Sequence, residues 1–191
     1  MRLKPNEILA AGVIVVFIVA VIGLGLYPTL REAPTKQCLT NLKDIGTVLN
    51  LYIGDNAGTF PPAASWVDGL GDQYAENLSS FVCPGARPTA EQLQQLHGER
   101  GLPIGYSLFR PLGGANSRLI ATPEKTPWVF DSSEIRPNSA ADVAAFSFRH
   151  AGKNANVLFC DGHSVSVTAA PAIPHPLMKP ADEATPPSHA H

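Results

Sequence analysis

Residues 8–27 read ILAAGVIVVFIVAVIGLGLY and contain no charged side chain. A helix rises about 1.5 Å per residue, so a run of this length can cross the roughly 30 Å hydrocarbon layer of a bilayer. The alternative is a core helix of a soluble domain, but such a helix usually keeps a polar stripe and this run has none. The sequence therefore predicts an uncleaved transmembrane anchor at the start of the chain.

The segment at 35–53 is predicted to be a second, amphipathic helical stretch. Its apolar side chains recur at steps of four and three residues and form one stripe: Cys38, Leu42, Ile45, Leu49 and Tyr52. That spacing is typical of a helix that buries one face. Pro28 and Pro34 precede it and predict a kink or break, because proline removes a helical hydrogen bond and clashes with the preceding turn. We expect the anchor and the folded domain to share one helical spine.

Composition and length bound the rest of the molecule. The chain has 191 residues and a net charge of −2, which leaves no basic patch of the kind that binds nucleic acid. We expect three regions: an anchor and kinked linker at 1–34, an α+β domain at 35–168, and a proline-rich, disordered tail at 169–191.

The topology prediction rests on charge and on cysteine use. Arg2 and Lys4 precede the apolar run, and basic residues also follow it, so the positive-inside rule is nearly balanced. A long C-terminal domain can be translocated despite nearby charges. Because the cysteines favour an oxidising exterior, we expect a single-pass protein with its amino terminus in the cytoplasm and its domain outside.

Several short segments are strand candidates, and one predicts a hairpin. The candidates are 104–110, 118–122, 128–131 and 143–149. Two β-prone runs within 154–168 flank Asp161 and Gly162, a pair that suits the two positive-φ positions of a type I′ turn. In that register Leu158 would face Val165. We therefore expect a small antiparallel sheet that ends in this hairpin.

Three cysteines are present, at positions 38, 83 and 160. They form no CxxC pair and fit no zinc-finger spacing. Outside the cytoplasm one pair could close a disulfide, and we expect Cys38 and Cys83 to be that pair. The alternative is three unpaired cysteines, two of them packed as small apolar side chains.

One cluster could carry chemistry. His150, Asp161 and His163 could gather near the end of the hairpin, and their side chains are reasonable ligands for a divalent metal. The alternative is structural: the turn requires Asp161 and Gly162, and His163 begins a strand. No nucleophile elbow or phosphate-binding glycine motif occurs. We therefore expect no enzyme, and a metal site only as a secondary interpretation.

The order of these pieces resembles a known family. An apolar N-terminal helix, then CLTNLKDIGTVLNLYIGDNAGTFPP, FVCPG and FSFRHAGKNANVLFCDGHSVSV is similar to pilin-like proteins with a C-terminal H-X9-DG signature, which are abundant in planctomycete-type bacteria and look like type II secretion pseudopilins. The resemblance implies a pilin-like fold in which a long helix, half transmembrane and half amphipathic, packs on the sheet. It also implies a structural subunit of the inner membrane that assembles with copies of itself or with other pilin-like subunits in a secretion or pilus apparatus.

Two features depart from that family pattern. The start MRLKPNEIL lacks the glycine of a prepilin peptidase site, and ten residues rather than nine separate His150 from Asp161. By the resemblance, Glu7 would help neighbouring subunits find their register; the alternative is an ordinary acidic residue at a helix start. A second function stays open: a membrane-tethered extracytoplasmic binding module with a metal site near the final hairpin.

Overall fold

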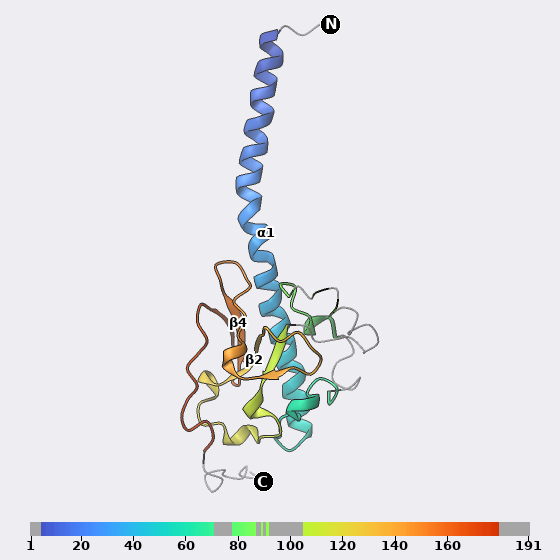
Figure 1. The fold of residues 1–191 in the computed structure, drawn as a ribbon, viewed down its shortest axis with the longest axis vertical. Coiled ribbons are helices and arrows are strands. Elements are labelled where there is room, and N and C mark those ends of the chain that lie inside the picture. Colours follow the sequence, from blue (N-terminus) through green and yellow to red (C-terminus); the bar gives the residue numbers. More distant parts are fainter. Residues whose placement is uncertain (1–4, 71–77, 87–88, 90, 92–104, 180–191) are drawn as a thin grey trace, which may run out of the picture. The chain divides into compact units, whose positions relative to one another are not determined.

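The computed structural model describes residues 5–70, 78–86, 89, 91 and 105–179. It divides the chain into two compact units, Met1–Ala33 and Pro34–His191. The first element is the α-helix α1, Pro5–Asp55 (Figure 1). Both Pro28 and Pro34 lie inside these bounds, so the helix does not end where the prolines predicted a break.

The second unit contains a mixed five-stranded sheet in the order β3-β1-β2-β4-β5. Its strands are β1 (Tyr106–Phe109), β2 (Pro127–Asp131), β3 (Ala140–Ala141), β4 (Ala155–Phe159) and β5 (Ser164–Val167). Most pairs are antiparallel, but β1 pairs with β3 in parallel. The α+β class stands, whereas the prediction of a small antiparallel sheet in a pilin-like fold is wrong. A two-residue edge strand has no hydropathy pattern from which its direction could have been read.

In the described part of the chain, six short 3-10 helices connect these elements: η1 (Ala63–Ser65), η2 (Leu78–Phe81), η3 (Arg110–Leu112), η4 (Ser117–Leu119), η5 (Pro123–Lys125) and η6 (Val143–Ala145). Two of them, η4 and η6, occupy segments that were predicted to be strands. Such single turns are frequent connectors because they need few residues and few hydrogen bonds. Strand candidates at 104–110 and 128–131 are confirmed by β1 and β2.

The core of the second unit lies between the sheet and the last part of α1. Four side chains of the predicted apolar stripe are fully buried: Cys38, Leu42, Ile45 and Leu49. Between them, Gly46 lets the helix approach β4, since a Cβ at this position would lie 3.1 Å from a methyl carbon of Leu158. Figure 1 shows β2 and β4 beside this part of the helix. The helix predicted at 35–53 is therefore confirmed, together with the face that it buries.

The final hairpin differs from its prediction by one residue. Leu158 pairs with Ser164 and not with Val165. The backbone N–H of Phe159 donates to His163 O at 2.9 Å, and of the two turn residues only Gly162 has a positive φ, +91°. A type I′ turn needs positive φ at both central residues, whereas a three-residue loop needs it only at the last. The loop is therefore Cys160-Asp161-Gly162.

The predicted transmembrane anchor is not supported. Among the described residues, no helix combines the length and the apolar character that are needed to span a bilayer. The single-pass topology and the inner-membrane location predicted from the sequence are accordingly withdrawn.

Part of the predicted disordered tail pairs with the rest of the fold. Met178 forms an isolated β-bridge with Ile120, and the backbone N–H of Ala121 donates to Leu177 O at 3.0 Å. Both Leu177 and Met178 pack against the core. Apolar residues scattered between prolines, which suggested disorder, thus cover the edge of the domain. Residues 180–191 lie outside the described part of the chain.

Candidate metal centre

Four buried side chains from separate segments converge beside α1: Cys38, Cys83, Asp131 and His150. We call this group the buried centre. Cys38 belongs to the buried stripe of α1, and Asp131 is the last residue of β2. Cys83 follows η2, and His150 precedes β4, where it forms a β-bridge with Asn154. The centre therefore joins the helix, the sheet and two connecting segments.

The potential ligand atoms of the buried centre lie within 4.8 Å of one another. The Sγ atoms of Cys38 and Cys83 are 3.6 Å apart, and Cys83 Sγ is also 3.6 Å from His150 Nε2. Asp131 lies closer to its neighbours: Cys38 Sγ is 3.0 Å from Oδ1, and His150 Nε2 is 2.9 Å from Oδ2. Two thiols, a carboxylate and an imidazole in such proximity could hold a divalent metal ion.

Further contacts orient the ligand atoms from outside. The Tyr106 hydroxyl donates to Cys38 Sγ at 3.0 Å, and the backbone N–H of Asn156 donates to Asp131 Oδ2 at 2.6 Å. Partners of this kind fix ligand orientation in metal sites. His150 Nδ1 points away from the cluster, is buried, and has no hydrogen-bond partner among the described residues.

Burial and mutual contact perturb the protonation of these groups. Burial raises the pKa of the Cys38 thiol far above its ordinary value, and the contacts with Cys83 and Asp131 act in the same direction. For Cys83, the hydrogen bond from Cys38 outweighs burial and lowers the pKa to about 6, with His150 helping. Burial disfavours protonation of His150, but the hydrogen bonds with Asp131 and Cys83 prevail and raise its pKa to about 9. These contacts therefore make proton loss easier at Cys83 than at Cys38 and favour the protonated form of His150.

Two glycines make room for the centre. A Cβ at Gly85 would lie 2.8 Å from His150 Cε1, closer than real Cβ contacts. Gly105 has a φ of +84°, and a Cβ there would lie 2.7 Å from Arg149 Nη1 and 3.2 Å from Cys83 Cβ. The Arg149 guanidinium donates to the backbone oxygen of Ser132. Because Gly85 and Gly105 have no side chain, there is room beside them for the side chains of Cys83 and His150. Any larger residue at either position would occupy that space.

The cysteines of the expected disulfide lie together but are not bonded. Cys38, Cys83 and Cys160 are all free thiols in the structure. An S–S bond is about 2.05 Å long, so the 3.6 Å separation between Cys38 and Cys83 is a contact. The two residues that the sequence paired are thus adjacent, and the disulfide itself stays a prediction. Cys160 lies in the hairpin loop, where burial and the nearby Asp161 carboxylate raise its pKa.

The structure divides the histidines and aspartate that the sequence grouped as metal ligands. His150 belongs to the buried centre, whereas Asp161 and His163 form an exposed pair at the hairpin, with His163 Nδ1 2.6 Å from Asp161 Oδ1. Gly162, the remaining signature residue, provides the positive φ of that loop. Glu7 lies within α1, but its side chain is outside the described part of the structure.

Sequence reasoning missed the full composition of the buried centre. Its ligands are far apart along the chain, with Cys38 and Asp131 separated by 93 residues, so no short motif marks them. One signal was available: Cys38 stands on the buried stripe of the helix, and Asp131 ends a strand rich in apolar residues, where a charged side chain needs a partner.

Comparison of the chain with protein-family models, curated proteins and solved structures finds no match.

Proposed function

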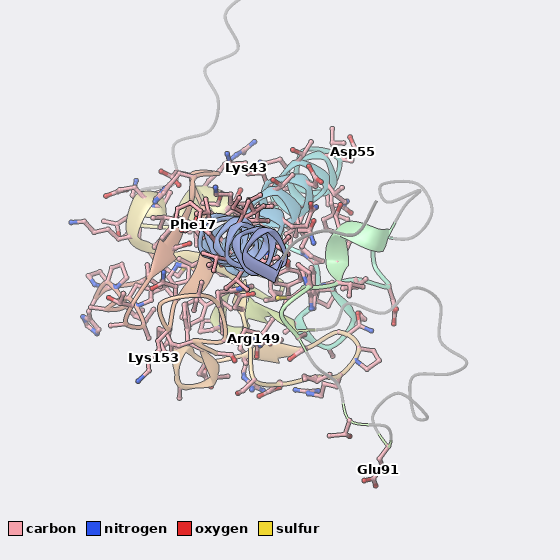
Figure 2. All side chains as sticks on the ribbon, turned by 90° about the horizontal axis from the view of Figure 1, so that it is seen from above. Phe17, Lys43, Asp55, Glu91, Arg149 and Lys153 are labelled. Atoms are coloured by element: carbon pink, nitrogen blue, oxygen red, sulfur yellow. The ribbon has the colours of Figure 1, made fainter. Side chains whose placement is uncertain are left out.

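We propose that the protein is a pseudopilin-like structural subunit that self-associates through residues 12–23 of α1. We call residues 12–23 the apolar segment. The observation that carries the proposal is the exposure of this segment: every residue in it is exposed, and Phe17, labelled in Figure 2, is 68% exposed. Soluble proteins rarely leave so large a continuous apolar surface uncovered, and such surfaces mark interaction sites.

The occupant that fits this surface is the same segment of a second copy. Nine large apolar side chains of the segment point outward around the helix: Val13, Ile14, Val15, Val16, Phe17, Ile18, Val19, Val21 and Ile22. A helix that is apolar on all sides needs apolar neighbours on more than one side, which several identical helices can provide. Parallel copies would also bury this surface without bringing charges together, since residues 12–23 contain none.

Small residues support close approach between such helices. A Cβ added at Gly12 or Gly23 would meet nothing within 4 Å, so the backbone is open at both ends of the segment. Glycine and alanine at helix interfaces let backbones come near one another and increase van der Waals contact. The family resemblance of the sequence points in the same direction, because pilin-like subunits assemble through their N-terminal helices.

Sedimentation velocity of the full chain in a mild detergent tests the proposal. We expect concentration-dependent oligomers, and we expect Ile18→Lys to shift the chain to monomer, because a buried lysine without a partner would oppose association. Leu51→Lys is the matched control. It also replaces a large apolar residue of α1 by lysine, at a position that is 56% exposed and lies outside the apolar segment, and it should leave the oligomers unchanged.

Two results would count against this function. One is a monomer at all accessible concentrations, and the other is an equal loss of oligomers in the Ile18→Lys and Leu51→Lys proteins. Circular dichroism of each variant shows whether the fold survives. Both substitutions lie on exposed positions, so the domain should stay folded in each.

A further inference from the structure

We propose that the buried centre binds Zn²⁺ as a closed, four-coordinate structural site. The inference goes beyond self-association, since the centre lies in the second unit and uses no residue of the apolar segment. It assigns a role to buried charged and thiol groups that simple packing does not explain. Charged residues are rarely fully buried without a strong partner.

The spacing of the ligand atoms suits a tetrahedral ion. With Zn–S bonds of about 2.3 Å and Zn–N bonds of about 2.0 Å, neighbouring ligand atoms lie roughly 3.3–3.8 Å apart. The two distances from Cys83 Sγ, to Cys38 Sγ and to His150 Nε2, are both 3.6 Å and fall within that range. Asp131 offers two oxygens at hydrogen-bond distance, Oδ1 at 3.0 Å from Cys38 Sγ and Oδ2 at 2.9 Å from His150 Nε2, and both distances are shorter than tetrahedral edges. An opening of about half an ångström at Asp131 would admit the ion.

The ligand types select zinc over the common hard cations. Calcium and magnesium take oxygen ligands in sets of six or more, whereas thiolate and imidazole suit zinc and its borderline-soft neighbours. All four positions of a tetrahedron are filled by protein, which is typical of structural sites and leaves no place for a substrate. The site is therefore assigned to fold maintenance and not to catalysis.

Charge balance supports occupation by a divalent cation. Two thiolates and one carboxylate would face Zn²⁺, which leaves a net charge of about −1 in the site. The Tyr106 hydroxyl and the Asn156 N–H already donate into the ligand atoms and would stabilise that charge. Arg149, close to Gly105 and Cys83, adds a positive charge from the side.

Such an ion would tie α1 to the sheet. Cys38 comes from the helix, Asp131 from β2, and the remaining ligands from segments that flank η2 and β4. Segments this distant in sequence form the site only in the folded chain, so the binding free energy of the ion adds to the stability of the fold. The expected consequence is a cooperative loss of stability when the ion is removed.

Metal titration of the full chain tests the site. The reduced protein is stripped with chelator, titrated with Co²⁺ under anaerobic conditions, and then back-titrated with Zn²⁺. We expect about one Co²⁺ per chain, with tetrahedral d–d bands and a thiolate-to-cobalt charge-transfer band, and displacement of both by Zn²⁺. His150→Ala should lower the affinity at least tenfold, and His150→Cys should restore binding with a stronger charge-transfer band.

Cys160→Ser is the matched control, because it removes the thiol outside the centre and should leave the titration unchanged. Two results would overturn the proposal. One is the absence of tetrahedral cobalt bands in a folded, fully reduced chain. The other is a native chain in which thiol titration after denaturation finds Cys38 and Cys83 oxidised to a disulfide and metal analysis finds no zinc. Neither result bears on the oligomers of the Ile18→Lys experiment.

Discussion

Asp131 shows how one buried side chain connects distant parts of this molecule. Its carboxylate accepts from the Cys38 thiol and from the backbone of Asn156, and it contacts the His150 imidazole. A carboxylate in such a place is costly unless donors surround it, and here they come from a helix, a strand and a connecting segment. Loss of any one donor would leave part of that cost uncompensated.

Glu134 provides a pH-dependent contribution to stability outside the buried centre. Partial burial opposes ionisation, but hydrogen bonds from Arg136, at 3.0 and 2.7 Å, and from Ser139, at 3.1 Å, prevail and lower the pKa of its carboxyl. A lowered pKa in the folded state means stability that is present above the unfolded value and lost as the pH falls through the folded value.

Glu134→Gln should therefore lower the free energy of unfolding by roughly 0.5–1.5 kcal/mol at pH 7. Below its ordinary pKa of 4.5, the difference from the unsubstituted chain should shrink as the carboxyl takes up a proton in both states. Urea unfolding at several pH values measures this. Glu124→Gln in η5 changes an exposed carboxyl and serves as the control. A difference that grows on acidification would contradict the argument.

At the scale of elements, the second half of α1 is the best predicted part of the fold. Its stripe at steps of three and four residues could be read directly, because burial of one helical face imposes that period. Leu42 and Leu49 are both fully buried as the pattern requires. Strands of two to five residues carry too little pattern for the same certainty, which is why β3 was missed and η6 was taken for a strand.

The buried stripe makes a quantitative prediction. Leu42→Ala removes a fully buried side chain and should lower the free energy of unfolding by about 2–5 kcal/mol, through lost burial and the cavity left behind. Leu51→Ala, on the exposed side of the same helix, should change it by less than about 0.5 kcal/mol. Chemical denaturation of both proteins gives the comparison. Similar losses in the two would mean that the helix does not bury the face described.

Two glycine-to-alanine substitutions, one in the hairpin loop and one in α1, should change the free energy of unfolding in opposite directions. Gly162 has a φ of +91° and a Cβ there would meet nothing within 4 Å, so Gly162→Ala isolates backbone strain. We expect it to lower the free energy of unfolding by about 1 kcal/mol. Gly54→Ala, at a helical position of α1 that is equally open, should raise it by roughly 0.5–1 kcal/mol. Thermal unfolding of the pair distinguishes the two, and a stabilising Gly162→Ala would contradict the three-residue loop.

At the scale of the whole molecule, long-range convergence was beyond the sequence. His150 was identified as a candidate ligand and Cys38 was paired with Cys83, but neither assignment placed the three together with Asp131. Hydropathy patterns report which side of an element is buried and say nothing of which buried faces meet. The resemblance to pilin-like proteins stays a prediction, and the assembly role is the part of it that experiment can reach most directly.

Photo-cross-linking from the apolar segment is that experiment. Phe17 is replaced by benzoylphenylalanine in the full chain, and light- and heavy-isotope preparations are mixed before irradiation. Self-association through the apolar segment predicts mixed-isotope dimers in which residue 17 of one copy is joined to residues 12–23 of another. Cross-links confined to a single copy, or directed to detergent alone while the chain stays monomeric, would contradict it.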